Sequence, residues 1–272
     1  MREHGLFLSG KIKTGVVDTP HHYHTGYEII LVEDGEIDAI IGNKRYRAGA
    51  GSVVCIGNLD EHNVEVIQPP YRRLYLILDS AQTDRKMESH ELLAPFKTRT
   101  EDFSPVVTLS EEEFAEAKDL ALRILQEAEK NLPYADKMMD SLVCALLVKL
   151  FRAMQPSLTF LSTPQFSTAA NVQTFLDANF QESITLEEIA AQFFVNKYYL
   201  SHIFKQYTGF SVMQYLQKAR LAYAKKLLST TDLSVRDIST QCNFGDESNF
   251  IRCFKREYAA TPLAYRKAVQ KK

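Results

Sequence analysis

The sequence has no apolar run long enough to cross a lipid bilayer. A membrane-spanning helix needs about 20 consecutive apolar residues, and polar or charged residues interrupt every apolar run of this 272-residue chain well before that length. The N-terminus also lacks the apolar core of a secretory signal peptide. We therefore expect a cytoplasmic protein that makes no contact with membranes.

Cysteine is scarce as well. The four cysteines are Cys55, Cys144, Cys242 and Cys253, and no two of them form a CxxC pair. This spacing gives no support for a redox motif or a zinc-binding pair. We expect all four to be reduced and to be buried as small apolar side chains.

The chain also lacks the excess of positive charge that is typical of nucleic-acid binders, because its net charge is −2. Its two parts differ, however. From residue 167 onward there are 14 Lys and Arg against 9 Asp and Glu, which leaves 18 against 25 in the first 166 residues. Only the C-terminal part carries the sign of charge that a phosphate backbone attracts. Ordinary solvated surface would produce such an imbalance too, so charge alone does not decide between the two interpretations.

Residues 233–266 have the pattern of a helix-turn-helix. Ser234, with Asp237 three residues later, is typical of a helix N-terminus, and apolar residues then recur at helical spacing. Residues 243–245 end this short helix, because Asn and Gly tolerate left-handed backbone angles. Asp246 can cap a second helix with a polar, arginine-bearing face, which is what the DNA major groove accommodates. This second helix buries three apolar residues, Phe250, Cys253 and Phe254.

The same pattern occurs upstream in residues 184–215, and two copies are a far more specific signal than one. Thr185 and Glu188 form the capping pattern of the first copy. With a one-residue slip at the turn, the apolar residues Ile184, Leu186, Ile189, Leu200 and Phe204 correspond to Leu233, Val235, Ile238, Phe250 and Phe254. A bridging helix is expected over residues 211–228. Its length of about 27 Å would hold two reading helices near the groove spacing of roughly 34 Å.

The last hundred residues resemble the AraC/XylS family of bacterial transcription regulators. The residues that carry the resemblance are RLAYAKKLLSTTDLSVRDIS from Arg220, Phe244-Gly245, Asn249-Phe250, Phe254-Lys255-Arg256, Thr261-Pro262 and Tyr265-Arg266. One departure is Ala259, which stands where the family usually has glycine and where the first copy keeps Gly209. This departure questions the geometry of one turn but not the fold.

The resemblance implies which side chains meet DNA. Base contacts are expected from Tyr198, Ser201 and His202 in the first copy and from Glu247, Ser248 and Arg252 in the second. The flanking DNA-binding residues are expected to be Asn196, Lys197, Lys205, Lys255 and Arg256. Arg252 is the strongest candidate for base reading, because a guanidinium group can engage O6 and N7 of guanine together. Lys255 and Arg256, nearer the helix end, suit phosphate contacts.

Residues up to about 80 are predicted to form strands. Short alternating or β-branched runs cover residues 27–32, 36–41, 52–56, 63–67 and 71–78. The dipeptides Asp34-Gly35 and Gly42-Asn43 are hairpin signals. Closely spaced strands of this kind favour a small antiparallel barrel or jelly roll.

Two stretches in this region, residues 20–37 and 48–62, resemble the cupin barrel that many AraC/XylS regulators carry at the N-terminus as an effector sensor. The residues that match the two cupin motifs are His22, His24, Glu28 and His62. Gly57 stands where the second motif usually has proline. The resemblance therefore implies an effector pocket lined by the four matching residues.

The same four residues could hold a metal. Even spacing would place His22, His24 and Glu28 on one face of a regular strand, and that face could line the barrel. Together with His62, three imidazoles and a carboxylate would suit Zn²⁺, Ni²⁺, Fe²⁺ or Mn²⁺. Alternatively, the four residues line a metal-free pocket or only hold the barrel together. By family resemblance most sensor cupins require no metal, so no cofactor is expected to be required.

Two long helices are predicted over residues 110–130 and 134–154, after a polar segment, residues 81–105, with no sustained period. The second helix has two adjacent apolar stripes: Met138, Leu142, Leu146 and Phe151, and beside them Met139, Val143, Leu147 and Leu150. This exceeds what one barrel contact needs. Either both helices only cap the barrel, or the stripe around Leu146 and Leu150 also forms a homodimer seam, as the family resemblance implies.

The predicted fold is α+β with two domains. A cupin-like antiparallel β-barrel takes residues 1–108, and two helices that cap it and dimerise take residues 109–155. Residues 156–166 contain two prolines and four Ser or Thr, and they are the expected linker. Residues 167–272 are then an all-α, AraC-type DNA-binding domain in which a linker helix joins two helix-turn-helices.

One function explains both halves of the chain: a DNA-binding transcription regulator whose cupin domain senses a small molecule, a sugar by family analogy. Tyr23, Tyr27 and Arg47 near the cupin motifs would accept hydroxyl-rich or anionic ligands alike. A metal-dependent cupin enzyme would leave the helix-turn-helices unexplained, and an architectural DNA-binding protein would leave the barrel without a role. We expect no catalytic residues. The expected partners are promoter DNA, the effector, a second copy of the chain and, for an activator, RNA polymerase.

Overall fold

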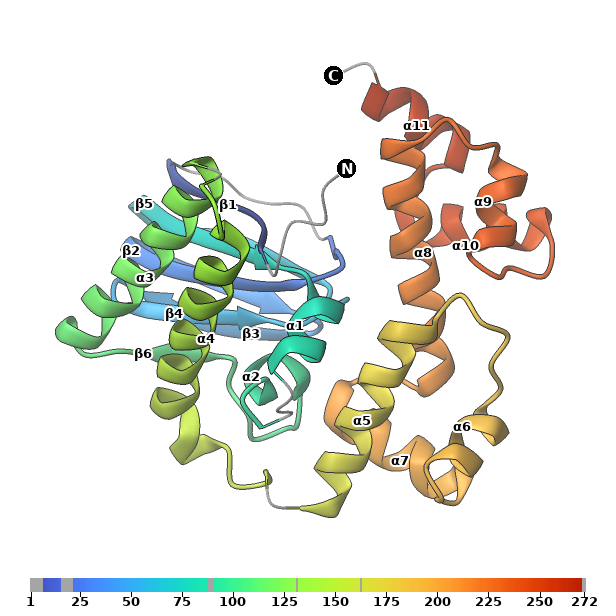
Figure 1. Ribbon diagram of the computed structural model, residues 1–272, viewed down its shortest axis with the longest axis horizontal. Helices are drawn as coiled ribbons and strands as arrows, with labels where there is room; N and C mark the ends of the chain where they lie inside the picture. Colours follow the sequence, from blue (N-terminus) through green and yellow to red (C-terminus); the bar gives the residue numbers. More distant parts are fainter. Residues whose placement is uncertain (1–6, 16–21, 88–90, 131, 162, 271–272) are drawn as a thin grey trace. The chain divides into compact units, whose positions relative to one another are not determined.

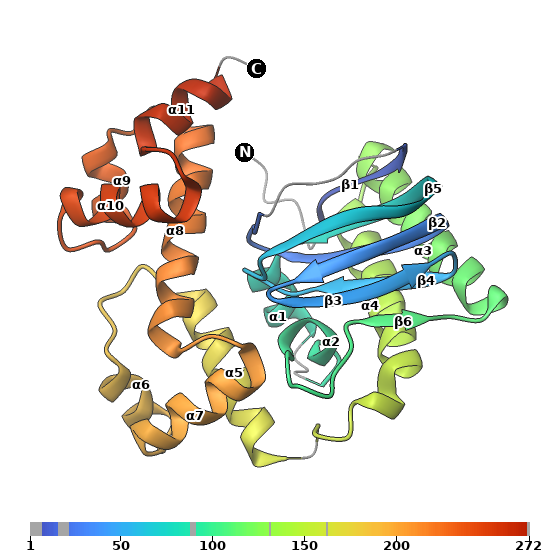
Figure 2. The same ribbon diagram turned by 180° about the vertical axis from the view of Figure 1, so that it is seen from behind.

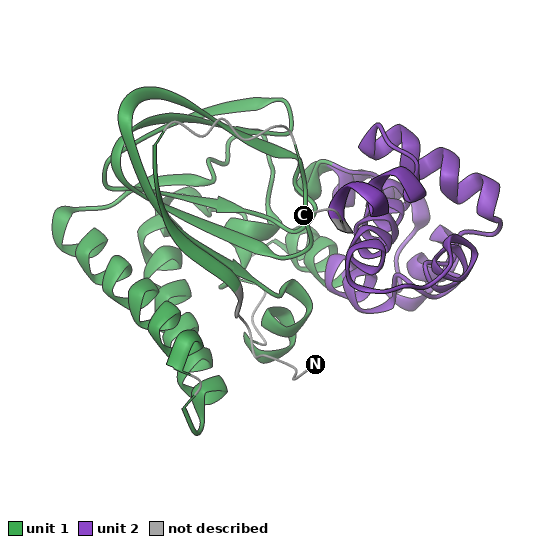
Figure 3. Cartoon of the chain, turned by 90° about the horizontal axis from the view of Figure 1, so that it is seen from above, with its two compact units in different colours: residues 1–171, 206–209 green, residues 172–205, 210–272 purple. Residues whose placement is uncertain are grey.

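A computed structural model of the chain describes residues 7–15, 22–87, 91–130, 132–161 and 163–270. Two compact units are coloured separately in Figure 3: unit 1 comprises residues 1–171 and 206–209, and unit 2 comprises residues 172–205 and 210–272. Within the described ranges, no helix combines the length and the apolar character that a membrane span needs.

Unit 1 is built on one antiparallel sheet. Its six strands, counted over the described residues, are β1 (Phe7–Thr14), β2 (Tyr27–Ile41), β3 (Lys44–Gly49), β4 (Ser52–Ile56), β5 (His62–Leu78) and β6 (Val106–Thr108). Their order is β1-β5-β2-β4-β6, and β3 also pairs with β2. Figure 2 shows the long strands β2 and β5 side by side, and Figure 3 shows the sheet curling around an interior. The expected antiparallel cupin architecture is confirmed.

Alternation along the strands separates an inner face from a face covered by helices. On β5, Arg73 and Tyr75 line an internal cavity. Leu76, the next residue of β5 after Tyr75, faces the helices instead. A Cβ placed on Gly10 of β1 would lie 2.8 Å from a side-chain carbon of Leu76 and 2.8 Å from one of the helical residue Leu125, so these three residues meet on the same face. The apolar interior is formed by Ile30, Val32, Ile37, Ala39, Ile41, Ala48, Val54, Ile56, Val64 and Tyr71.

The hairpin predicted at Asp34-Gly35 is wrong, because β2 continues through it with register irregularities against β5. Gly35 has φ +80°, and a Cβ there would lie 2.4 Å from the Pro70 carbonyl oxygen. Glycine is therefore needed for the close approach of two strands and not for a chain reversal. The strands predicted over 63–67 and 71–78 are likewise one strand, β5. The turn at Gly42-Asn43 is confirmed and joins β2 to β3.

The polar segment after β5 contains two short helices that its composition did not predict, α1 (Ser80–Met87) and α2 (Ala94–Lys97). The second of them explains Gly57. A Cβ at this position would lie 2.2 Å from the Phe96 carbonyl oxygen of α2, so only glycine fits there. The Gly57 amide donates to Asp60 Oδ2 at 2.7 Å. The departure from the cupin pattern thus accommodates α2.

The two long predicted helices are confirmed as α3 (Glu111–Lys130) and α4 (Ala135–Met154), and they lie across one face of the sheet (Figure 1). The dimer seam predicted through Leu146 and Leu150 is wrong in its residues, because these side chains are 0% and 1% exposed within a single chain. Beyond Met138, most of both stripes of α4 is buried against α3 and the rest of unit 1. The large apolar side chains left exposed nearby are Leu132, Tyr134 and Met138.

Seven helices follow in the described part of the chain: α5 (Pro164–Asn179), α6 (Leu186–Gln192), α7 (Lys197–Thr208), α8 (Val212–Thr230), α9 (Val235–Gln241), α10 (Glu247–Tyr258) and α11 (Pro262–Gln270). Helix α5 begins inside the segment 156–166 that was predicted to be the linker. Pro164 suits the first helical position, and the Thr163 hydroxyl accepts from the Phe166 amide at 3.3 Å. Between α4 and α5 the chain forms a short 3-10 helix, Gln155–Ser157.

Both predicted helix-turn-helices are confirmed, as α6–α7 and α9–α10, with α8 bridging them. Thr185 and Glu188 form a reciprocal capping box, and Asp246 Oδ1 accepts from the Asn249 amide at 2.7 Å. The turn at Ala259 has the same geometry as the corresponding turn of the first copy, even though alanine replaces glycine. Ala259 has φ 54°, in the same left-handed region as Gly209 with φ 79°. Alanine adopts this conformation at a cost of about 1–2 kcal/mol.

Three of the four cysteines are buried, as predicted, while Cys144 is half-buried, and all four are free. Burial raises the pKa of the Cys55 thiol to about 12, and it raises the pKa of Cys242 to about 12 as well. At neutral pH both side chains are therefore uncharged and pack as small apolar groups.

Candidate nucleic-acid interface and ligand cavity

The reading helix of the second copy, α10, has one buried and one exposed face. Phe250, Cys253 and Phe254 belong to the core that α10 shares with α8 and α9. The exposed side chains are the five that sequence analysis assigned to DNA: Glu247, Ser248, Arg252, Lys255 and Arg256. This face carries three cations against one acid, so its electrostatics suit a phosphate backbone.

Two amide side chains hold the arginines of this face. Asn249 Oδ1 accepts from Arg252 Nη2 at 3.0 Å, and Gln217 Oε1 of α8 accepts from Arg256 Nη2 at 3.2 Å. Sequence analysis did not find either role. Asn249 precedes Arg252 by three residues, the spacing at which side chains meet on a helix, so its role was visible in the pattern. Gln217 is far from Arg256 in sequence, and only the fold brings the two together.

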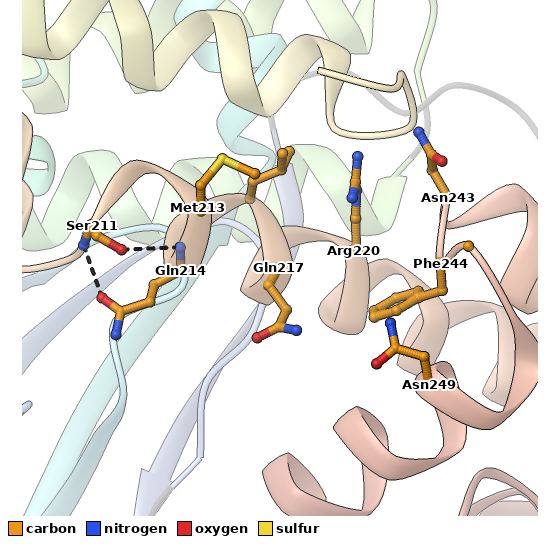
Figure 4. Close-up of a pocket in the computed structure, with 10 residues that line it drawn as sticks. Ser211, Met213, Gln214, Gln217, Arg220, Asn243, Phe244 and Asn249 are labelled. Carbon is orange, nitrogen blue, oxygen red and sulfur yellow. Dashed lines mark hydrogen bonds between the residues drawn. The ribbon is translucent and has the colours of Figure 1, made fainter. Parts of the chain in front are cut away.

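A polar groove of about 400 Å³ lies between α8 and the second helix-turn-helix. Figure 4 shows Gln214, Gln217 and Arg220 projecting from α8, opposite Asn243, Phe244 and Asn249. Arg220 is already engaged, because it donates from Nε to the Phe180 carbonyl and from Nη2 to the Glu182 carbonyl, both at 2.7 Å. It therefore braces the chain ahead of α6 and is not a free cation.

On the reading helix of the first copy, α7, most of the predicted DNA-binding residues are exposed: Asn196, Tyr198, His202 and Lys205, with Ser201 and Lys197 half-buried. The Asn196 side chain accepts from the Tyr198 amide at 2.8 Å and so caps the helix. Lys197 is paired with Glu187 of α6 at 2.7 Å, which partly neutralises it. Beside this face, Phe194 is 95% exposed in the turn, a feature that sequence analysis missed.

The four cupin-motif residues lie together in unit 1. The ligand nitrogens of His22, His24 and His62 are within 4.8 Å of one another. Glu28 Oε2 is 3.1 Å from His24 Nε2 and 3.2 Å from His62 Nε2. The premise of a regular strand does not hold, because β2 begins only at Tyr27. His22 instead reaches His62 through two backbone hydrogen bonds, of 3.0 and 2.8 Å.

The cluster is electrostatically coupled. Burial by itself would raise the pKa of Glu28, but the imidazoles of His24 and His62 outweigh burial and hold that pKa well below its usual range. Glu28 is therefore ionised at neutral pH. His62 Nδ1 lies 2.8 Å from the Asp60 carbonyl oxygen, so Nδ1 is the nitrogen that donates. Its Nε2 faces Glu28 Oε2 at 3.2 Å inside the cluster, so Nε2 is the atom that would serve as a ligand.

These residues line a cavity of about 170 Å³, which they share with Lys13, Arg73 and Tyr75. Tyr27 and Arg47, which were expected near such a cavity, do not line it. The Tyr27 hydroxyl donates to Asp84 Oδ1 at 2.9 Å, and Arg47 is an exposed residue of β3 that pairs with Asp38 at 2.6 Å. The missed cation is Arg73. The alternation Tyr71-x-Arg73-x-Tyr75, which places a cation between two aromatics on one strand face, was the available signal.

Known proteins match both halves of the chain. Residues 189–268 match the family model of a helix-turn-helix domain, and residues 10–69 match that of a cupin domain. The HTH-type transcriptional activator RhaS of Klebsiella pneumoniae (strain 342) is 26% identical over 249 residues, which cover 89% of this chain and 86% of RhaS. Over most of its length the chain is similar to the AraC/XylS family of transcription regulators. Like them, it combines a cupin domain with a helix-turn-helix domain, the part of these regulators that binds DNA.

Further similar proteins agree. The HTH-type transcriptional activator RhaR of Yersinia pestis bv. Antiqua (strain Angola) is 25% identical over 254 residues, covering 90% of this chain and 83% of RhaR. The crystal structure of ToxT from Vibrio cholerae shares the two-domain fold, with a TM-score of 0.59, 13% identity and coverage of 96% and 98%. RhaS and RhaR are transcriptional activators and not enzymes, so these relatives favour a regulator over the alternative of a cupin enzyme.

Proposed function

We propose that this regulator binds promoter DNA through α7 and α10 and that a small metabolite in the cavity of unit 1 changes its DNA affinity. A sugar or sugar derivative is the ligand class that we favour, and the cytoplasm is where the protein would act. The observation that supports this proposal is the cavity itself, where ionised Glu28, three imidazoles and Arg73 converge inside an otherwise apolar barrel. Convergent polar groups in an apolar pocket are typical of a ligand site.

Within unit 2 we assign the base contacts to Tyr198, Ser201 and His202 on α7 and to Glu247, Ser248 and Arg252 on α10. Asn196, Lys197, Lys205, Lys255 and Arg256 would contact the phosphate backbone. The exposure of all these side chains except the half-buried Lys197 and Ser201 supports the assignment, and so does the amide of Asn249 that holds Arg252. We also retain the proposed division into a sensor (1–108), helices (109–155), a linker (156–166) and a DNA-binding domain (167–272).

The test is effector-dependent DNA binding by the intact chain. An operator is first selected from a random DNA library, and its affinity is then measured by fluorescence anisotropy with and without each member of a metabolite panel. Coupling between two sites of 1–3 kcal/mol corresponds to a change in affinity of about 5- to 150-fold. We expect at least one metabolite to produce such a change. Tight operator binding that no metabolite alters would contradict the sensor role.

We further propose that the histidine cluster can hold a divalent transition metal. The donor set fits, because three imidazoles and a carboxylate suit Zn²⁺, Ni²⁺, Fe²⁺ or Mn²⁺. The hydrogen bond from His62 Nδ1 to a backbone carbonyl is the outer contact that such ligands usually have. Bound there, a metal would supply a Lewis-acidic anchor for an oxygen atom of the effector.

We also propose that the regulator acts as a homodimer and, if it activates transcription, that it contacts RNA polymerase. The exposed apolar side chains Leu132, Tyr134 and Met138, at the start of α4, are the best candidates for the dimer contact. An exposed cluster of this kind suits an isologous interface, in which the same patch of both copies meets.

A further inference from the structure

We propose that the effector of this regulator is an anion whose carboxylate or phosphate group binds Arg73 and Lys13 in the cavity of unit 1. The inference rests on the proposed sensor function. It narrows the ligand from any small metabolite to hydroxylated anions, such as sugar acids and sugar phosphates.

Among the residues that the structure describes, Arg73 is a buried cation without a counter-charge. It is 5% exposed, its Nε has no hydrogen-bond partner, and it forms no ion pair within the described part of the chain. Its guanidinium carbon lies 5.6 Å from the ring centres of both Tyr71 and Tyr75. The two aromatic rings attract a cation, and the Tyr71 hydroxyl accepts a hydrogen bond from it, but neither tyrosine supplies a negative charge. A buried charge in this state is costly unless something pairs with it.

A second cation stands directly opposite. Lys13 of β1 pairs in register with Arg73 of β5, and both line the cavity. Like charges at directly opposed positions destabilise a sheet. Lys13 forms no ion pair among the described residues, and its Nζ lies over the Tyr75 ring at 5.4 Å. The carboxylate of the cavity wall, Glu28, does not offset the pair, because its Oε2 already contacts two imidazoles.

The ligand that satisfies these groups is anionic at one end. A guanidinium group binds carboxylate or phosphate through parallel hydrogen bonds, and the buried Tyr71 hydroxyl, whose oxygen accepts from Arg73, keeps its own O–H as one more donor. Glu28 pairs in register with Ile77 of β5. Ile77 lies four residues along the strand from Arg73, a separation of about 13 Å. Hydroxyl groups of the ligand suit that second position. At about 170 Å³ the cavity is smaller than the 300–1,000 Å³ of typical drug-sized sites, which favours a small metabolite.

The test uses thermal unfolding of the full chain. Melting temperatures are compared at equal ionic strength in chloride, acetate and inorganic phosphate, and then with glucose, glucuronate and glucose 6-phosphate. We expect anions, and not glucose, to raise the melting temperature. A higher melting temperature in both glucuronate and acetate indicates a carboxylate ligand. A higher melting temperature in both glucose 6-phosphate and inorganic phosphate indicates a phosphorylated ligand. Arg73→Gln and Lys13→Gln should each weaken the anion's binding by about tenfold or more, because each removes a charge-assisted contact.

The matched control is Arg85→Gln, which removes the same charge from an exposed position on α1 and should change nothing. Ligand-free Arg73→Gln should melt no lower than the wild type, since it removes an unpaired buried charge. If it fails to fold, Lys13→Gln carries the test, because Lys13 is exposed. The inference is overturned if no anion distinguishes the wild type from these variants, or if glucose binds as tightly as glucuronate. Failure of every ligand to alter operator binding would instead overturn the sensor function.

Discussion

Arg252 is the side chain whose loss should change DNA sequence preference most. It is exposed on α10 and held by Asn249, and a bidentate guanine contact is worth about 1–3 kcal/mol of discrimination. Arg252→Ala should therefore weaken binding to a selected operator by about that amount and relax the preference at one base pair. Lys255→Ala is the matched control: it should weaken binding to all sequences and lower the salt slope by about one. Equal losses for Arg252→Ala on operator and scrambled DNA would refute the base contact.

The backbone of Ala259 is strained, whereas that of Gly209, its counterpart in the first copy, is not. Both positions follow a reading helix in left-handed conformation, with φ 54° at Ala259 and 79° at Gly209. Ala259→Gly should raise the free energy of unfolding by about 0.5–1 kcal/mol, because relief of about 1–2 kcal/mol of strain exceeds the entropy cost of glycine. Urea unfolding measures this. Ala264→Gly, inside helix α11, should have the opposite sign, and a shared sign would mean that the strain at Ala259 is negligible.

At the scale of elements, α4 shows how an apolar helix face differs from an interface. Leu146→Glu should prevent unit 1 from folding, because it places a charge among side chains that a single chain already buries. Met138→Glu should leave the fold intact, since Met138 is 48% exposed, and should convert the proposed dimer to monomers in sedimentation.

Met213→Glu is the matched control for this pair, because Met213 is 44% exposed in unit 2 and its substitution should leave the oligomeric state unchanged. A dimer that survives Met138→Glu would place the contact away from the start of α4.

At the scale of the whole molecule, metal content and DNA binding can be measured on the same preparation. If the cavity holds a metal, the purified chain should contain about one equivalent, and His24→Ala should remove it, because the loss of one of few ligands breaks the coordination. His202→Ala removes an exposed imidazole from unit 2 and should leave the metal in place. A metal-free chain whose His24→Ala variant loses only the effector response would show that the cluster binds the ligand directly.

Local sequence rules determined most of unit 2. Capping residues such as Thr185 and Asp246 act on backbone groups within a few residues, and so does the spacing of buried aromatic residues. The sequence next to such a helix end is therefore enough to predict it. Unit 1 was harder. Gly35 looks like a turn locally and is a close approach of two long strands, because the carbonyl it must avoid, Pro70, lies 35 residues away.

Only the tertiary structure decided which side chains meet. The even spacing of the histidines predicted one face of a strand, yet His22 reaches His62 through a bridge outside any strand. Arg73 became a candidate ligand anchor only because the fold places Lys13 opposite it and gives it no ion pair within the described ranges. The two apolar stripes of α4 showed how much of the helix surface must be buried, but not which part of the protein covers it. Sequence patterns record what a residue needs, whereas burial, register and charge pairing depend on groups that are distant in the chain.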